Sequence, residues 1–202
     1  MCETIINLKC STKTFIAKTV TPAKIITLDQ IREKYPDCKE TKFRNCVIKK
    51  IDRKCVKLYT NASLQINGIL LDDDICKLFE DLNLQHDYVV KCVMSNWTVK
   101  PSNKKIDLKR TMTQLNNNNI TSYFLRGIPL IIKYNVKDTL SELIVTNNNG
   151  KYTCKENELG LVPTEVSILM FKSGSCIISG KTEYACRKAI INVKKHIIHM
   201  DS

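Results

Sequence analysis

Cysteine and histidine are the side chains of this sequence with the widest scope for chemistry. Structural zinc sites use closely spaced ligand pairs such as CxxC, which place two of the four ligands at once. The chain has no CxxC, and His196 and His199 have no cysteine pair beside them. The ten cysteines are Cys2, Cys10, Cys38, Cys46, Cys55, Cys76, Cys92, Cys154, Cys176 and Cys186. We therefore predict no metal site.

Catalytic groups are equally sparse. A cysteine nucleophile needs a histidine as its base, and the chain offers only His86, His196 and His199. No cluster of carboxylates falls at an expected strand end, and no glycine-rich phosphate loop is present. We therefore predict no catalytic residues and no cofactor, and we favour a binding protein over an enzyme.

The thiols are expected to be reduced. An even number of cysteines also permits disulfides, but the opening segment MCETIINLKC has no apolar signal-peptide core. No apolar run approaches the about 20 residues that a membrane span needs. We expect a soluble intracellular protein with buried free thiols.

The net charge indicates a polyanionic partner. The chain has 32 Lys and Arg against 20 Asp and Glu, which gives +12 at pH 7. Lysine and arginine that neutralise phosphates release condensed counterions, so a surplus of this size favours nucleic acid. A merely soluble basic protein remains an alternative.

The elements that could position a binding surface occur twice. VKLYTNASLQING (56–68) matches ILMFKSGSCIISG (168–180), with an aromatic residue at the fourth position and glycine at the end. LKCSTKTF (8–15) matches VKCVMSNW (90–97), and CVIKK (46–50) matches LIIKY (130–134) at an offset of 84 residues. These three strand matches, together with the helical stretch that follows the last of them in each half, occur in the same order and predict an internal repeat.

Each half is predicted to run strand, short helix, several strands, long helix. The short helices begin at Thr27, with Gln30 completing a capping box, and near Asp107. We place the repeats at 1–84 and 85–202, with an insert of about 28 residues within 135–167 that forms a hairpin or loop at its Asn-Asn-Asn-Gly turn. The fold class is α+β, with helices on one face of an antiparallel sheet.

Strand alternation separates a core face from an open face. In 56–67 the even positions from Val56 to Ile66 are mainly apolar, which is typical of packing under helices. The odd positions, from Lys57 to Asn67, carry one aromatic residue with amides and hydroxyls. Such side chains can approach the floor of a DNA minor groove, and an exposed aromatic can enter a base step. The alternative is an aromatic that closes the edge of a core.

The sequence resembles the TATA-box-binding protein (TBP) family. The segments that carry the resemblance are KFRNCVIKKI, VKLYTNASLQING, SYFLRGIPLIIKY and ILMFKSGSCIISG, in an order that covers residues 4–199. The resemblance implies a saddle of two repeats, a curved antiparallel sheet with helices on its convex face. It also implies binding and bending of TA-rich promoter DNA through the minor groove.

The resemblance implies specific roles for a few positions. Phe43 and Tyr59 match the wedge pair of the first repeat, and Phe171 matches one wedge of the second. The fourth wedge is open between Gly127 or Ile128 and nearby Phe124.

Further positions match the groove floor and the phosphate contacts. Asn7 matches a central asparagine whose mate here is Lys91, and Asn67 and Ser179 replace threonines that face the floor. Lys49 and Lys133 match basic residues near the phosphates. The full expected DNA-binding set is Asn7, Phe43, Asn45, Val47, Lys49, Tyr59, Asn61, Ser63, Asn67, Lys91, Phe124, Ile128, Lys133, Leu169, Phe171, Ser173, Ile177 and Ser179.

Partners follow from the same resemblance. They are double-stranded DNA, a transcription-factor-IIB-like protein or other initiation factors, and RNA polymerase, with no membrane. The long helix of the first repeat is acidic through Asp72, Asp73, Asp74, Glu80 and Asp81, whereas that of the second is basic, which indicates partners that are exchanged relative to the family. The Asn- and Lys-rich composition suggests a large DNA virus or a divergent protist. The expected location is therefore the nucleus, a cytoplasmic viral factory or a virion.

The main alternative function is a scaffold of the same fold that has lost DNA binding, because Lys91 is central and one wedge is missing. An enzyme or enzyme accessory domain is a third.

Overall fold

The computed structural model describes residues 7–42, 45–69, 74–100, 104–125 and 129–200. Within them the chain is a mixed α+β protein with four helices and one antiparallel sheet of ten strands. The elements of the first half are β1 (Leu8–Thr19), α1 (Leu28–Lys34), β2 (Lys39–Glu40), β3 (Cys46–Ile51), β4 (Lys54–Tyr59), β5 (Leu64–Ile69) and α2 (Asp74–Asp81). Those of the second half are β6 (Tyr88–Val99), α3 (Leu108–Asn117), β7 (Ser122–Phe124), β8 (Leu130–Asn148), β9 (Lys151–Met170), β10 (Cys176–Gly180) and α4 (Glu183–Lys194).

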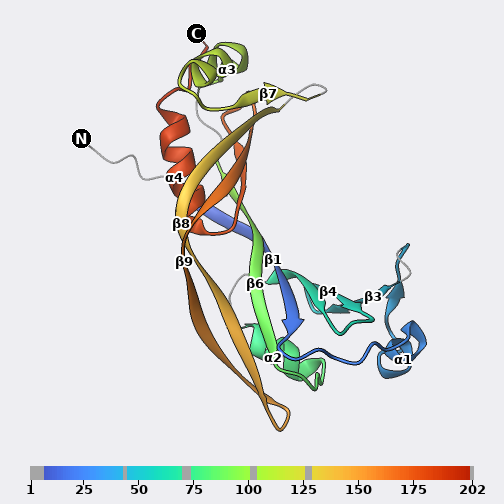
Figure 1. The fold of residues 1–202 in the computed structure, drawn as a ribbon. Coiled ribbons are helices and arrows are strands. Elements are labelled where there is room, and N and C mark those ends of the chain that lie inside the picture. The colour runs from blue at the N-terminus through green and yellow to red at the C-terminus, as the bar shows by residue number, and fades with distance from the viewer. Residues whose placement is uncertain (1–6, 43–44, 70–73, 101–103, 126–128, 201–202) are drawn as a thin grey trace. The chain divides into compact units, whose positions relative to one another are not determined.

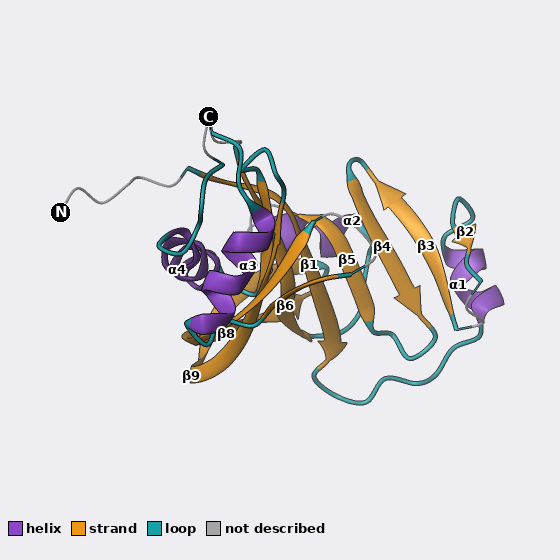
Figure 2. Ribbon diagram, turned by 90° about the horizontal axis from the view of Figure 1, so that it is seen from above, coloured by secondary structure: helices purple, strands orange, loops and turns teal. Residues whose placement is uncertain are grey.

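The two halves of the sheet have the same strand order. Hydrogen-bonded neighbours follow the sequence β2-β3-β4-β5-β1-β6-β10-β9-β8-β7. Read outward from β1 and from β6, the two halves list corresponding strands in the same order. Figure 2 shows β1, β5, β4 and β3 side by side, with α1 next to β3.

The chain forms two compact units, and the boundaries between them fall within β1, β6, β8 and β9. The first unit comprises residues 12–93 and 141–159, and the second comprises residues 94–140 and 160–200 with the start of β1 up to Ser11. Each unit has its own apolar core beneath two helices. In the first unit Ile31 of α1 and Phe79 of α2 pack against β4, β5 and β6, and in the second Leu115 of α3 and Ile190 of α4 pack against β8, β9 and β10.

The helix starts predicted from the sequence are confirmed. The Thr27 side chain accepts a hydrogen bond from the Gln30 backbone N–H, and the Gln30 side chain accepts one from the Thr27 N–H. Asp107 caps α3 by accepting from the N–H groups of Lys109 and Arg110. These bonds satisfy donors that have no partner inside the helix. None of the described helices is long and apolar enough to cross a membrane.

The predicted insert is a long hairpin. β8 and β9 have 19 and 20 residues and are joined at Asn149 and Gly150, both of which have positive φ. Figure 1 shows them as a long two-stranded ribbon that ends in a turn. Its outer part belongs to the first unit, where β8 pairs with β6 through Tyr88 opposite Val145 and Val90 opposite Leu143.

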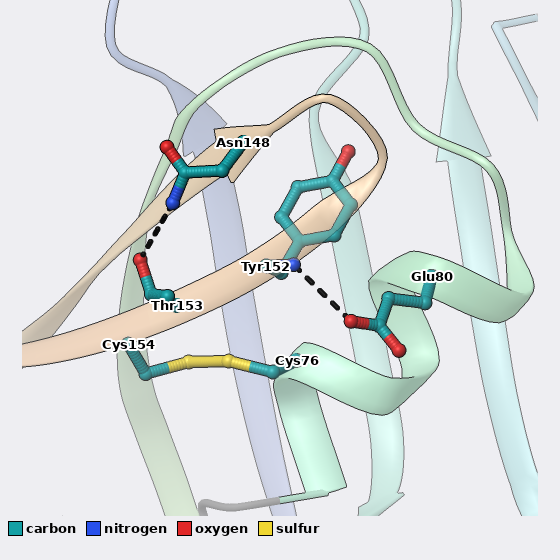
Figure 3. Close-up of a disulfide and its surroundings, with 6 residues drawn as sticks. All are labelled: Cys76, Glu80, Asn148, Tyr152, Thr153 and Cys154. Atoms are coloured by element: carbon teal, nitrogen blue, oxygen red, sulfur yellow. Dashed lines mark hydrogen bonds between the residues drawn. A yellow bond between two sulfur atoms is a disulfide. The ribbon is translucent and has the colours of Figure 1, made fainter.

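A disulfide joins the tip of this ribbon to α2, and this corrects the expectation of free thiols. Cys76 of α2 is bonded to Cys154 of β9, which is 78 residues later in the chain (Figure 3). Beside it the Tyr152 N–H donates to Glu80 at 3.2 Å, and the Tyr152 hydroxyl donates to the Leu84 carbonyl at 2.6 Å. Sequence spacing gave no sign of the pair, because only the folded ribbon brings β9 beside α2. The other described cysteines are not part of a disulfide.

Candidate nucleic-acid interface

Two hairpin turns hold aromatic residues in the same local geometry. In the β4–β5 turn the Tyr59 N–H donates to the Ser63 carbonyl at 3.1 Å, and the Ala62 N–H donates to the Tyr59 carbonyl at 2.9 Å. In the β9–β10 turn the Phe171 N–H donates to the Ser175 carbonyl at 3.0 Å, and the Gly174 N–H donates to the Phe171 carbonyl at 2.8 Å. Ala62 and Gly174 both have positive φ. Tyr59 and Phe171 therefore occupy equivalent positions in the two units.

The polar side chains of these turns mainly stabilise the turns themselves. The Asn61 Oδ1 accepts from the Ser63 N–H at 3.1 Å and from the Ser63 hydroxyl at 2.6 Å. In the other turn the Ser173 and Ser175 hydroxyls share a hydrogen bond of 2.8 Å. Short polar side chains that bond to nearby backbone are typical of tight turns.

In the first unit the open face, which is the sheet face opposite the helices, carries amides and hydroxyls. Asn67 lies opposite Thr14 in the ladder, and its Oδ1 accepts from the Thr14 hydroxyl at 2.9 Å. Lys57 lies opposite Gln65, and the Tyr59 hydroxyl is 3.4 Å from the Gln65 Oε1. Partial burial raises the pKa of Tyr59, so this phenol stays neutral at physiological pH.

In the second unit the open face is more apolar. Leu169 lies opposite Ile177, and Ser167 lies opposite Ser179, on the face that alternates with the buried residues of β9 and β10. Ile177 is 38% exposed. The Ser179 hydroxyl donates to the Asn96 Oδ1 at 2.7 Å.

Two predicted contacts of β3 lie on the wrong face. Val47 lies opposite Leu58 and is buried in the core, and Lys49 lies opposite Val56 on the same side. The Lys49 Nζ is 2.5 Å from the Asp37 Oδ1 and 5.5 Å from the centre of the Tyr35 ring. Its hydrogen bond lowers the pKa of Asp37. Neither side chain reaches the open face, which corrects the expectation that both contact DNA.

The candidates for the fourth wedge also need correction. Phe124 lies opposite buried Leu130 and packs against the core of the second unit. Its neighbour Tyr123 lies opposite Ile131 on the open face and is 40% exposed. Tyr123 is therefore an aromatic of this face that sequence reasoning missed, although alternation along SYF could have identified it. Phe43, Gly127 and Ile128 lie outside the described residues.

The two other lysines of the predicted DNA-binding set, Lys133 and Lys91, each form an ion pair with a carboxylate. The Lys133 Nζ is 2.6 Å from the Glu165 Oε1 and 2.7 Å from the Ser167 hydroxyl. The Lys91 Nζ is 2.8 Å from the Glu142 Oε2, and hydrogen bonds from Lys91 and Asn157 lower the pKa of Glu142. The charges of Lys91 and Lys133 are thus each partly balanced by a ribbon carboxylate.

Asn7 and Asn45 are exposed at the starts of β1 and β3. The Asn45 carbonyl accepts from the Thr60 N–H at 3.0 Å, which places it beside the β4–β5 turn that holds Tyr59. Within the described residues no group of three or more His, Cys, Asp or Glu side chains is arranged to hold a metal ion.

Comparison with known proteins identifies the fold. The chain is similar to the solved structure of the Methanococcus jannaschii TBP, with a TM-score of 0.59, and the match covers 94% of this chain and 97% of that one. The two sequences are 12% identical over the match, so the likeness shows the fold. No protein-family model matches the sequence, and no curated protein sequence does. The protein therefore has a TBP-like fold, as its sequence predicted.

Proposed function

We propose that this protein binds double-stranded DNA through the minor groove and bends it, as an initiation factor of transcription. The open faces of its units form the contact surface. The observation that carries the proposal is the equivalent placement of Tyr59 and Phe171 in two turns of the same geometry, within a TBP-like fold. An aromatic ring that enters a base step unstacks it at a cost of a few kcal/mol, and the larger contact surface of the bent DNA offsets that cost.

The neighbours of these rings suit the groove floor. The minor groove of A·T pairs offers only the acceptors adenine N3 and thymine O2. The Asn67 Oδ1 already accepts from Thr14, which orients the Asn67 NH₂ group as a donor. Ser179 and Asn96 supply further hydroxyl and amide groups in the second unit.

The test is a measurement of bending and affinity on one labelled TA-rich duplex. Phe171→Ala and Tyr59→Ala should each reduce the fluorescence-transfer signal of bending more than they reduce affinity. Tyr184→Ala is the matched control, because Tyr184 is 56% exposed on α4, on the helix side of the sheet. Unchanged bending in both wedge variants would overturn the proposal.

Stability separates a wedge from a core residue. Phe171 is not part of either buried core, whereas Phe79 is fully buried in the first. Phe79→Ala should cost roughly 3–5 kcal/mol of unfolding free energy, and Phe171→Ala well below that. A large loss of melting temperature for Phe171→Ala with unaltered bending would assign the ring a structural role.

A protein-interaction scaffold is the second candidate, and the carboxylates on Lys133 and Lys91 favour it. Glu165→Gln distinguishes the two functions. If Lys133 contacts phosphate, loss of the competing carboxylate should raise DNA affinity. If the open face binds a protein instead, Glu165→Gln should leave the weak affinity of a basic protein for DNA almost unchanged.

The same proposal includes partners and location. We infer initiation factors, among them a factor-IIB-like protein, and RNA polymerase as partners. The corresponding location is the nucleus, or a viral factory or virion if the protein is viral.

A further inference from the structure

The outward face of α4 combines exposed apolar side chains with positive charge. Tyr184 is 56% exposed and Ile191 43% exposed, although both belong to a helix whose other side is fully buried. Residues that are three, four or seven apart share one face of a helix. The α4 outer face therefore consists of Tyr184, Arg187, Lys188, Ile191 and Lys195.

The arginine of this face is ion-paired within the helix, whereas its two lysines contact neutral groups. Glu183 forms an ion pair with Arg187 at 2.6 Å. The Lys188 Nζ lies 3.2 Å from the Tyr184 hydroxyl, and the Lys195 Nζ donates to the Asn192 side chain at 3.0 Å, so both interact with neutral groups. Lys194 is exposed beside them. Because contacts of this kind at an exposed surface are weak, the lysines can turn toward a partner.

The other long helix shows what such a face can bind. The buried residues of α2 and its end, Ile75, Leu78, Phe79 and Leu82, have the same spacing as Cys186, Ala189, Ile190 and Val193 of α4. In this alignment Cys76 corresponds to Arg187, and Glu80 corresponds to Ile191.

On α2 these two positions, Cys76 and Glu80, are bonded to the strand β9. Cys76 is bonded to Cys154, and Glu80 accepts from the Tyr152 N–H, so β9 runs alongside α2 (Figure 3). Tyr152 is the buried anchor, and its ring centre lies 5.6 Å from that of Phe79. The equivalent positions of α4 belong to the α4 outer face, which bears Ile191 and three cationic side chains.

We propose that the α4 outer face binds an extended acidic segment of a partner protein, with an aromatic or aliphatic anchor seated between Tyr184 and Ile191. Charge complementarity selects the partner: carboxylates would pair with Lys188, Lys195 and Arg187. Ile191 and Tyr184 lie seven residues apart, or about 10 Å along the helix, which suits one anchor side chain between them. The proposal does not depend on DNA binding, because α4 covers the other side of the sheet.

The first test uses a soluble copolymer of glutamate and tyrosine as the probe, with the full chain and fluorescence anisotropy. Lys188→Glu combined with Lys195→Glu should weaken binding at least about tenfold. Lys24→Glu combined with Lys151→Glu makes the same change of net charge at exposed sites elsewhere, and it should alter affinity by less than about twofold. Equal losses in both double variants would mean that only general attraction to a basic protein is measured, and would overturn the proposal.

The second test examines the apolar anchor. Ile191→Gln should weaken the glutamate–tyrosine probe several-fold but leave binding of polyglutamate unchanged. Tyr184→Gln serves the same purpose if the first variant folds poorly, and a thermal melt checks both. Equal effects on the two probes would contradict an anchor.

Two further outcomes would also reject the proposal. Displacement of the probe by a short DNA duplex would place the probe on the open face rather than on α4. A dimer in sedimentation that Ile191→Gln dissociates would show that a second copy of this chain is the occupant. If neither outcome occurs and backbone amides of α4 are protected by the probe, the acidic segment is the occupant.

Discussion

Lys49 and Lys133 show how closely the role of one residue depends on strand register. The sequence aligns them at an offset of 84 residues, but Lys49 contacts Asp37 on the helix side, whereas Lys133 lies on the open face. An offset of 85 restores matching faces, because it pairs buried Val47 with buried Ile132, and Lys49 with Tyr134, which packs against the core. A shift of one residue moves every side chain of a strand to the other face.

The two lysines therefore predict opposite results in DNA binding. Lys133→Ala should reduce the slope of log affinity against log salt by about one unit, because one phosphate contact is lost. Lys49→Ala should leave the slope unchanged while reducing stability slightly. Titrations of one duplex at several salt concentrations check both, and an unchanged slope for Lys133→Ala would remove it from the interface.

Buried phenols predict the response to alkali. Burial raises the pKa of Tyr35 and of Tyr152 to about 12, with the carboxylates of Asp87 and Glu80 contributing for Tyr152, and burial also raises the pKa of Tyr88. The folded state thus holds these protons more tightly than the unfolded chain. Their contribution to stability is present below the ordinary tyrosine pKa of 10.0 and is lost as the pH rises toward 12.

Tyr152→Phe should make the free energy of unfolding less sensitive to pH above 10. Urea titrations at about pH 8 and about pH 11 measure the difference. Tyr184→Phe is the control, because it makes the same substitution at an exposed position of α4. An identical pH dependence of Tyr152→Phe and the wild type would mean that Tyr152 ionises freely in the folded protein.

At the scale of elements, local patterns predicted most of the fold. The capping box of Thr27, the cap at Asp107 and the alternation of Val56, Leu58, Leu64 and Ile66 are each set by neighbours in sequence, and the structure confirms them. The hairpin of the insert was predictable from its turn residues. The packing of that hairpin against α2 was not predictable, because contacts such as Glu80 with Tyr152 join residues that are 72 apart in the chain.

The β8–β9 ribbon also changes the interpretation of α2 as a docking surface. The sequence predicted an acidic docking surface there, and Asp72 and Asp73 lie outside the described residues. Glu80 already accepts from the ribbon, while Asp74 lies 4.0 Å from Lys54. The chain's own β9 occupies part of the surface that a basic partner would need. Docking of a basic partner at the remaining exposed acid, Asp81, stays a prediction.

The disulfide predicts how firmly the ribbon is held. Cys154→Ser should lower the free energy of unfolding by about 2–4 kcal/mol, because the bond closes a long loop in the unfolded chain. A reductant should lower the wild type to the level of Cys154→Ser and leave the variant unchanged. Cys55→Ser, at a half-buried free thiol, is the control. A wild type that is insensitive to reductant in urea titrations would show that the ribbon is held by Tyr152 and β6 alone.

At the scale of the whole molecule, charge and deformability should make separable contributions to DNA binding. The net charge of +12 attracts any duplex, and this attraction weakens as salt displaces the protein from phosphates. Insertion of aromatic rings favours flexible pyrimidine–purine steps such as TA, at which unstacking costs least. The preference for TA-rich over GC-rich DNA should therefore persist as salt rises, while both affinities fall in parallel.

Two substitutions in the DNA and one in the protein test whether the TA-rich preference comes from the minor groove and from unstacking. Replacing A·T by inosine·C pairs changes the major groove but adds no amino group to the minor groove, so affinity should be largely retained. Replacing the same pairs by G·C adds the guanine N2 donor to the groove floor and should weaken binding and bending together. Phe171→Ala should narrow the TA-rich preference, because less of the binding free energy then depends on unstacking. Equal affinities for all three duplexes at every salt concentration would leave charge as the sole source of DNA binding, and would favour the scaffold.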